Sequence, residues 1–318
     1  MATAAPIALA APAGATLYAG KFAAGLFGSA DIADVVATGA LGNNAADLAG
    51  SILLDEMLPT GGLGMALGNV QIAIWGQSNA VGTALRAELA AAPLSADPDL
   101  ADYDANTLTF DRVRMWNGSA YVQLVMGSNN YGSAADKFGV EFGLAVRWMR
   151  ETTEGTLYLI KQASGGVSIT SFDPAPAALN WSNGNYEWGE AATWLAGQGV
   201  TLAARHWVWI QGESDKAQTQ AWYQDRLQEI LDALHSGGRM ADPASRAVLS
   251  QMHPSTGTYG AGVAAAKTAI AGATPSRFSD IQFSGYIQGD NIHYNARGMV
   301  QHAYDCFAFL FDAPDLGT

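Results

Sequence analysis

The stretch VQIAIWGQSN, residues 70–79, decides the fold class of this chain. Its first six residues form a short, largely apolar run that ends at Gly76, and the polar pair Ser78-Asn79 follows. A nearly continuous apolar run of this length is typical of a strand buried on both faces, as strands are in a parallel sheet. Gly76 allows the backbone to turn sharply after such a strand. The stretch therefore predicts a buried strand that turns into a helix over residues 80–91.

Three further apolar runs repeat this pattern at residues 156–161, 206–210 and 246–251. Amphipathic helices are expected between and after them, at residues 138–151, 187–197, 219–235, 263–271 and 295–311. Short apolar strands that alternate with amphipathic helices predict an α/β fold, in which helices cover both faces of a parallel sheet. Ligands bind such sheets beyond the carboxyl ends of the strands. Polar residues directly after each strand are therefore the candidates for chemistry.

Composition excludes several classes of protein. Of 318 residues, 14% are charged and 49% are hydrophobic, which rules out a solvated, disordered chain. The net charge of −13 argues against a protein held by charge on nucleic acid or on an anionic membrane surface. No run of about 18 apolar residues is present, so we expect no insertion into a membrane.

Cysteine and histidine usage bounds the cofactor chemistry. The single cysteine, Cys306, excludes an internal disulfide and a site built from several cysteines, and its apolar setting predicts a core position on a helix. Four of the five histidines lack the spacing of metal ligands: His206, His235, His253 and His302. We therefore expect no metal site and no cofactor.

Residues 1–68 differ from the predicted main domain, residues 69–318. They are rich in Ala and Gly, and they include a mildly apolar start without Lys or Arg before Lys21. Pro6 and Pro12 interrupt that start, so we expect no signal peptide. The segment is either an extension packed on the main domain or an attachment and oligomerisation segment.

Two polar clusters follow the first two predicted strands. Ser78 follows the first one, where its Oγ would lie near a helix N-terminus that favours developing negative charge, although a Ser here is also an ordinary N-cap. The pair Gly165-Gly166 follows the strand at 156–161. It can present a backbone N–H to an oxyanion, or it can simply form a turn.

Two more clusters lie later in the chain. Gln211 follows the strand at 206–210, and its amide is a further candidate oxyanion donor. Glu213 and Asp215 are candidates for acid–base work or for helix capping. Asp290 and His293 are spaced so that the carboxylate can hold Nδ1–H of the imidazole, which leaves Nε2 as a general base for a serine.

The order of the four clusters resembles the SGNH hydrolases, in particular the sialate O-acetylesterase-like and acetyl xylan esterase-like carbohydrate esterases. The resemblance rests on GQSN at 76–79, GG at 165–166, QGESD at 211–215 and DNIH at 290–293, and it covers about residues 70–312. FGVEF at 138–142 is similar to the Gly-Pro-Glu segment of that branch, with Val in place of Pro. The QGE sequence replaces the Gly-x-Asn-Asp of typical SGNH enzymes, so Gln stands where they use Asn.

This resemblance implies a three-layer, flavodoxin-like fold and a serine esterase that removes O-acetyl groups from a carbohydrate. Ser78 matches the nucleophile, His293 the general base and Asp290 its orienting partner. The implied oxyanion hole consists of the Ser78 N–H, a backbone N–H of Gly165 or Gly166, and the Gln211 side chain. The implied substrate is an acetylated polysaccharide.

Further residues are weaker candidates for substrate contacts. Residues 112–122 predict a hairpin with an Asn-Gly turn, and the predicted insert at 170–190 carries aromatic residues among Asn, Ser and Gly. Aromatic rings beside hydrogen-bonding groups suit the apolar face and the hydroxyls of a sugar, but packing of a loop on the core explains them as well. The candidates are Gln77, Asn79, Trp116, Trp181, Trp188 and Glu213.

An Ala/Gly-rich lead before an esterase domain also resembles the attachment region of phage or phage-like spike and tail-fibre proteins. This implies a homotrimer that binds particle proteins through residues 1–68 and deacetylates a bacterial surface polysaccharide outside the cell. Secretion without an N-terminal signal is the competing setting. A glycan-binding spike module with dispensable catalysis is the second functional class, although a pure binder need not retain Ser78, Asp290 and His293.

Overall fold

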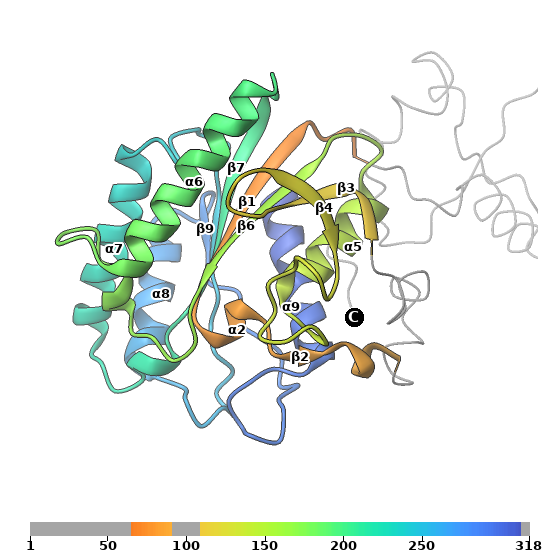
Figure 1. The fold of residues 1–318 in the computed structure, drawn as a ribbon. Coiled ribbons are helices and arrows are strands. Elements are labelled where there is room, and N and C mark those ends of the chain that lie inside the picture. Colours follow the sequence, from red (N-terminus) through yellow and green to blue (C-terminus); the bar gives the residue numbers. More distant parts are fainter. Residues whose placement is uncertain (1–64, 91–108, 313–318) are drawn as a thin grey trace, which may run out of the picture. The chain divides into compact units, whose positions relative to one another are not determined.

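The computed structural model describes residues 65–90 and 109–312 (Figure 1). These residues belong to a compact unit, Leu63–Thr318. The predicted attachment segment, residues 1–68, lies outside the described residues except for Met65–Gly68, which lead into the first strand.

A seven-stranded sheet runs through this unit in the order β4-β3-β6-β1-β7-β8-β9. Its strands are β1 (Asn69–Gly76), β3 (Thr109–Trp116), β4 (Tyr121–Val125), β6 (Leu157–Ala163), β7 (Leu202–Ile210), β8 (Ala247–Leu249) and β9 (Phe278–Ser279). Neighbouring strands are parallel except for β3 and β4, so the predicted parallel sheet is confirmed. Apart from the β3–β4 hairpin, the order is that of a flavodoxin-like sheet, in which ligands bind where the strand order reverses. Here this is the carboxyl end of β1.

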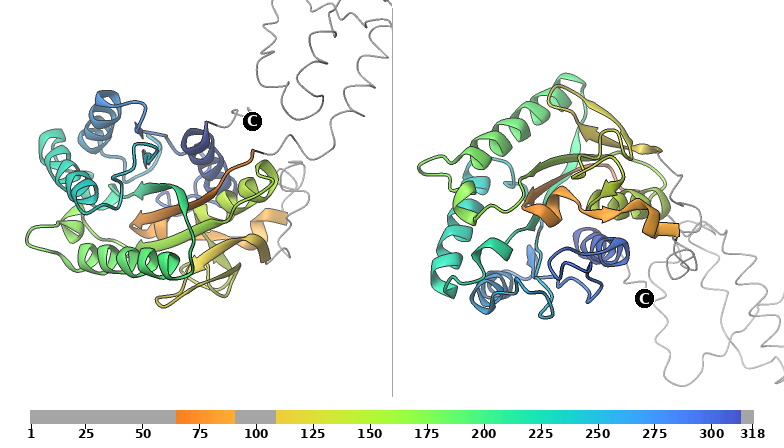
Figure 2. Two further views of the ribbon diagram at one scale, coloured as in Figure 1. Left: turned by 90° about the horizontal axis from the view of Figure 1, so that it is seen from above. Right: turned by 60° about the horizontal axis from the view of Figure 1, so that its bottom comes forward.

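Helices cover both faces of the sheet, as Figure 2 shows. The helices of one face are α5 (Val140–Glu151) and α9 (Ala296–Phe311), and those of the other are α6 (Leu179–Gly197), α7 (Gln220–Ser236) and α8 (Ala261–Ala273). The side chains of β1 alternate between the two cores, with Ile72 and Ile74 in one and Ala73 and Trp75 in the other. Burial on both faces explains why this strand is so apolar in sequence.

Several local predictions are confirmed. The helices expected at 138–151, 219–235, 263–271 and 295–311 are α5, α7, α8 and α9 with ends shifted by one or two residues. Residues 112–122 form most of the β3–β4 hairpin. Its turn contains Gly118 at a φ of 92°, which favours glycine. Cys306 is fully buried in α9, as expected.

No helix in the described ranges is long and apolar enough to cross a bilayer.

The helix predicted at 80–91 is wrong. A single turn, α2 (Ser78–Val81), ends at Gly82, which has a φ of 98°. The chain then pairs as β2 (Ala84–Leu85) with β5 (Lys137–Phe138) and continues as the 3₁₀ turn η1 (Arg86–Ala90). A Cβ on Gly82 would lie 2.4 Å from the backbone nitrogen of Gly139. The close approach of a distant segment thus sets the end of this helix.

The predicted insert at 170–190 is also largely helical. α6 begins at Leu179 rather than at residue 187, after the short 3₁₀ turn η2 (Ile169–Phe172). Trp181, Gly184 and Trp188 recur at helical spacing and are buried against the sheet. Burial of this apolar stripe outweighs the low helix propensity of the Asn, Ser and Gly residues among them.

Candidate active site

Ser78 lies directly beyond the carboxyl end of β1, at the first residue of α2. Gly76 has a φ of 145°, and a Cβ there would lie 1.9 Å from the carbonyl oxygen of Ile210, so only glycine lets β1 end this close to β7. The N–H of Gln77 donates to that carbonyl at 2.9 Å. Ser78 is half-buried, and its hydroxyl has no hydrogen-bond partner among the described residues. The hydroxyl is therefore not committed to a structural bond.

Asp290 and His293 form a hydrogen-bonded pair in the loop before α9. Asp290 Oδ2 lies 2.5 Å from His293 Nδ1, and Asp290 Oδ1 accepts the N–H groups of Ile292 and His293. Partial burial raises the pKa of Asp290, but the hydrogen bonds from His293 and Ile292 outweigh it and lower the pKa below its usual value. An ionised carboxylate on Nδ1–H leaves Nε2 of the imidazole free to accept a proton.

Asn79 links the loop of this pair to the turn that begins at Ser78. Its buried amide oxygen accepts the N–H of Tyr294 at 3.3 Å, and its Nδ2 lies 3.5 Å from the carbonyl oxygen of Ile292. The side chain next to Ser78 therefore holds the residues on both sides of His293. Nδ2 also donates to Oε1 of Glu213, at 2.6 Å, from the loop after β7. Asn79 and Glu213, predicted as substrate contacts, thus join three loops within the protein.

Gln77 and Gln211 form a second link between these loops. Gln77 Oε1 accepts Gln211 Nε2 at 3.2 Å and the backbone N–H of Ser214 at 3.3 Å. Gln211 Nε2 also donates to Asp215 Oδ2 at 2.6 Å and to the carbonyl of Val167 at 3.1 Å. Gln211 is fully buried, so it reaches an oxyanion only if one of these bonds opens. Its role as an oxyanion donor stays a prediction.

Gly165 and Gly166 lie in an exposed turn after β6. The N–H of Ser164 donates to the carbonyl of Gly76 at 3.1 Å, which ties this turn to the end of β1. A Cβ at Gly165 or Gly166 would meet nothing within 4 Å, so no side chain obstructs their backbone. The role of Gly165 or Gly166 as an oxyanion donor stays a prediction.

Comparison with known families decides the class of this protein. Residues 69–305 match the family described as "Carbohydrate esterase, sialic acid-specific acetylesterase". The chain belongs to this family. It is therefore a carbohydrate O-acetylesterase.

Solved structures resemble this esterase at low sequence identity. A protein from Arabidopsis thaliana is 15% identical at a TM-score of 0.55, over 77% of this chain and 98% of that protein, and it shares the fold. A carbohydrate acetylesterase from Xanthomonas citri is 15% identical at a TM-score of 0.46, over 77% of this chain and 57% of that one. NanS is 11% identical at a TM-score of 0.39, over 73% of this chain and 78% of NanS. A comparison with curated proteins found no match.

Three tryptophans predicted as substrate contacts of the esterase belong instead to the core. Trp116, Trp181 and Trp188 are at most 7% exposed. The indole N–H of Trp188 donates to Gln71 of β1 at 2.7 Å, and that of Trp116 donates to Glu187. Of the two explanations for these rings, packing on the core is the right one, because all three lie in the core cluster between α6 and the sheet, of which the β3–β4 hairpin is part.

A buried ion pair behind α2 was not predicted. Lys161, at the end of β6, lies 2.9 Å from Glu141 Oε2, and its ammonium also donates to the carbonyls of Val81 and Asn130. Burial lowers the pKa of Lys161, and the charge of Glu141 opposes that shift. Lys161 thus fixes the last residue of the turn that begins at Ser78. The FGVEF segment was the only sequence signal that pointed to Glu141. Its Val140 stands where the Gly-Pro-Glu segment has Pro, and it is the first residue of α5, a position that accepts Pro.

The esterase site contains no cluster of metal ligands. Within residues 65–90 and 109–312, no group of three His, Cys, Asp or Glu side chains is arranged to hold a metal ion. Asp215, a candidate for acid–base work, instead accepts hydrogen bonds from Ser168 and from the N–H of Ile169.

Proposed function

We propose that this esterase removes O-acetyl groups from a bacterial surface polysaccharide through an acetyl-enzyme formed on Ser78. The observation that supports the proposal is the contact of Asn79 with the residues flanking His293, because it ties the loop with the carboxylate-bound imidazole to the turn that begins at Ser78. A serine, a histidine and an aspartate in these roles form an acyl-transfer site on many unrelated folds.

In the first step, Ser78 Oγ attacks the acetyl carbonyl carbon while its proton passes to His293 Nε2. The tetrahedral intermediate then collapses, and the sugar oxygen leaves with the proton held by His293. In the second step, water attacks the acetyl-serine, and His293 takes its proton. Acetate leaves, and Ser78 regains its proton from His293. Asp290 stays ionised throughout and stabilises the imidazolium that forms in each step.

The oxyanion of each intermediate would be held by backbone N–H groups. The first N–H groups of a helix have no acceptor within it, so the N–H of Ser78 is free to donate. The exposed turn with Gly165 and Gly166 supplies the second donor. One donor of this kind is typically worth about 10²–10³ in rate. Gln211 would contribute by holding this turn through Val167 even if it donates nothing directly.

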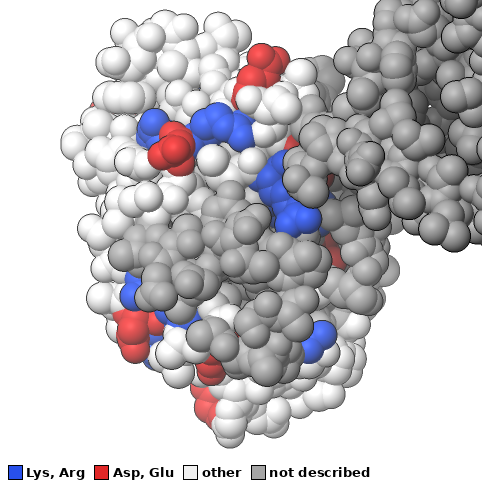
Figure 3. Space-filling view, turned by 90° about the vertical axis from the view of Figure 1, so that its right-hand side faces the viewer, with Lys and Arg blue, Asp and Glu red and all other residues white. Residues whose placement is uncertain are grey.

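Charge and exposed rings support a neutral or weakly charged glycan as substrate. The chain carries a net charge of −13, and on the face in Figure 3 the charged side chains lie in small groups of both signs among uncharged residues. Tyr286 is 41% exposed, and its neighbour Ile287 pairs with Tyr294, next to His293. The Tyr286 ring also lies against Arg297, with its centroid 4.4 Å from the guanidinium carbon. A ring held this close to the base offers a surface for a sugar.

The test is acetate release from an O-acetylated capsular polysaccharide, with p-nitrophenyl acetate as a small substrate. Ser78→Ala should lose roughly 10³-fold or more of both activities, whereas Ser182→Ala, on the exposed side of α6, should lose neither. Undiminished release by Ser78→Ala would exclude the mechanism. Hydrolysis of the small ester alone would exclude the polysaccharide. Polysaccharide binding by wild type and Ser78→Ala without acetate release would favour a receptor-binding module.

The setting is a separate proposal. We propose that the chain is a trimer attached through residues 1–68 to a phage-like particle, and its support is the Ala/Gly-rich composition of that segment. Light scattering of the full chain should give the mass of a trimer, and removal of residues 1–68 should give a monomer. A monomeric full chain would favour secretion without an N-terminal signal.

A further inference from the structure

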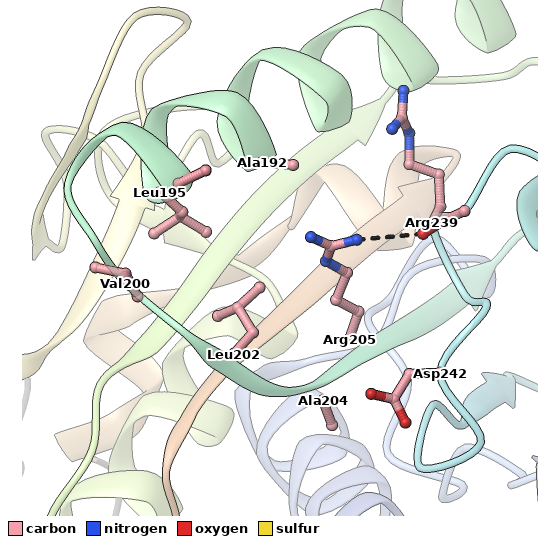
Figure 4. Close-up of a pocket in the computed structure, with 10 residues that line it drawn as sticks. Ala192, Leu195, Val200, Leu202, Ala204, Arg205, Arg239 and Asp242 are labelled. Atoms are coloured by element: carbon pink, nitrogen blue, oxygen red, sulfur yellow. Dashed lines mark hydrogen bonds between the residues drawn. The ribbon is translucent and has the colours of Figure 1, made fainter.

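A pocket lies far from Ser78, between α6, the first half of β7 and the residues that follow α7 (Figure 4). Its volume is about 260 Å³. Arg205, which lines it, pairs with Gln71 in the sheet, whereas Gln211 lies beyond the carboxyl end of β7. Arg205 and Gln211 are six positions apart along an extended strand, which corresponds to about 20 Å. The pocket is therefore independent of the esterase site.

Two arginines line this pocket without a carboxylate partner. Arg205 donates Nη1 to the carbonyl of Gly238 at 3.2 Å, and Arg239 donates Nε and Nη2 to Asn185 at 3.1 Å. Among the described residues, no acidic group forms an ion pair with either, and Nη2 of Arg205 and Nη1 of Arg239 have no acceptor. Burial lowers the pKa of Arg239, and the charge of Arg205 lowers it further, so the two cations repel each other.

Two other arginines of the chain are paired with carboxylates. Arg226 pairs with Asp173 at 3.0 Å, and Arg246 pairs with Asp312 at 2.7 Å. Asp242 lines the same pocket as Arg205 and Arg239, but its carboxylate accepts the N–H of Ala244 instead of contacting either guanidinium. Arg205 and Arg239 therefore line one pocket as two cations without a counter-charge in contact. Their free N–H groups suit a carboxylate or a phosphate.

The rest of the wall is apolar. It consists of small and branched side chains from α6 and the start of β7: Ala192, Leu195, Ala196, Val200, Leu202 and Ala204. Figure 4 shows Arg205 extending toward Ala192 and Leu195, so that its charged end lies over this wall. A bare inorganic ion would leave the wall uncovered. A ligand with both an anionic group and an apolar-faced ring would use both halves of the pocket.

We propose that the Arg205–Arg239 pocket binds a small organic anion, in which one carboxylate or phosphate is attached to a ring or short chain that covers the apolar wall. The anion accepts hydrogen bonds from the free guanidinium N–H groups and removes the repulsion between them. The volume accommodates a ligand of about the size of a single sugar ring.

Calorimetric titration of the full chain tests this site with five probes. Cyclohexanecarboxylate and glucuronate carry a carboxylate on a ring, and glucose 6-phosphate carries a phosphate. Acetate is the bare carboxylate, and glucose is the neutral ring. A ring-bearing anion should bind more tightly than acetate, and glucose should not bind. The carboxylate and phosphate probes then show which anion is preferred. If glucose or acetate binds as tightly as every ring-bearing anion, the proposal fails.

Matched variants locate the site. Arg205→Gln and Arg239→Gln should each weaken binding about tenfold, because each removes a charged donor. Arg114→Gln, in β3, should not change it. Asp242→Asn should tighten binding severalfold, since it removes the only acidic side chain among the lining residues. Unchanged hydrolysis of p-nitrophenyl acetate shows that each variant is folded. If the arginine variants misfold, Asp242→Asn still decides, because unaltered or weaker binding by it would overturn the site.

Discussion

The amide oxygen of Asn79 accepts a hydrogen bond from the backbone N–H of Tyr294 at 3.3 Å. These residues follow Ser78 and His293 directly in sequence, so this bond ties the turn α2, which begins at the serine, to the loop that carries the histidine. The same amide donates to Glu213, which anchors it to a third loop. Asn79 is thus a positioning residue for the proposed acyl transfer.

Asn79→Ala should lower kcat by about 10–100-fold with little change in KM, because the loop with His293 loses its attachment to α2. Removal of the amide also leaves a buried oxygen of Glu213 without a donor, so the free energy of unfolding should fall by about 1–3 kcal/mol. Steady-state kinetics and urea unfolding measure the two effects. Asn79→Asp should be worse than Asn79→Ala, since it places a second carboxylate against Glu213; equal or better activity would contradict the positioning role.

Asp290→Asn should lower kcat by roughly 10²–10⁴-fold while the fold stays intact. An amide in place of the carboxylate no longer stabilises the imidazolium, and it can hold His293 in the wrong tautomer. The matched control is Asp225→Asn on the exposed side of α7, which should keep full activity. Kinetics with p-nitrophenyl acetate measure both variants. Wild-type kcat in Asp290→Asn would mean that the 2.5 Å contact with His293 is not used in catalysis.

Lys161→Met should destabilise the protein by about 3–5 kcal/mol, because it leaves the fully buried Glu141 without its counter-charge. The double variant Lys161→Met with Glu141→Gln should recover part of this loss, since no unpaired charge remains. Urea unfolding measures both. The single variant should also lower kcat, because the carbonyl of Val81 loses its donor and the turn with Ser78 is released. A double variant less stable than the single one would show that the ion pair is not the source of the loss.

The pKa of Lys267 predicts a pH dependence of stability. Burial lowers this pKa from 10.5 to about 8, and nearby acidic groups, Glu213 first, oppose the shift. Between pH 8 and 10.5 the folded state therefore binds fewer protons than the unfolded state, so the free energy of unfolding rises with pH, by up to about 1.4 kcal/mol per unit. Urea unfolding at pH 8, 9 and 10 should show the stability of wild type rising relative to Lys267→Met. The exposed Lys216→Met should show no such trend, and a constant difference for Lys267→Met would contradict the lowered pKa.

Tyr286→Ala should raise KM for the acetylated polysaccharide several-fold and leave hydrolysis of p-nitrophenyl acetate unchanged. We expect a sugar chain bound at Ser78 to extend over the exposed ring, and the small ester to be too short to contact it. Tyr186→Ala is the control, because Tyr186 is 63% exposed on α6 and should affect neither substrate. Equal loss on both substrates would show that Tyr286 supports the His293 loop rather than the glycan.

Much of the site could be predicted from sequence because its motifs are local. The strand of residues 70–75 and the spacing of Asp290 and His293 depend on neighbouring residues, and parallel strands place their carboxyl ends at one edge of the sheet. The role of single side chains could not be predicted in this way. Trp188 as a sugar contact depends on burial, and this side chain is in fact enclosed by packing and hydrogen-bonding partners from other elements.

The sequence by itself determined the α/β class, the alternation of strands and helices, and the positions of the polar clusters, because hydrophobic periodicity is a property of adjacent residues. Only the tertiary structure decided that α2 is a single turn, that residues 179–186 are helical and that the tryptophans of the aromatic insert are core. It also joined Asn79 to Tyr294 across 215 residues and paired Lys161 with Glu141 behind the serine. These contacts depend on which distant segments the packed sheet brings together, and no local pattern encodes that choice.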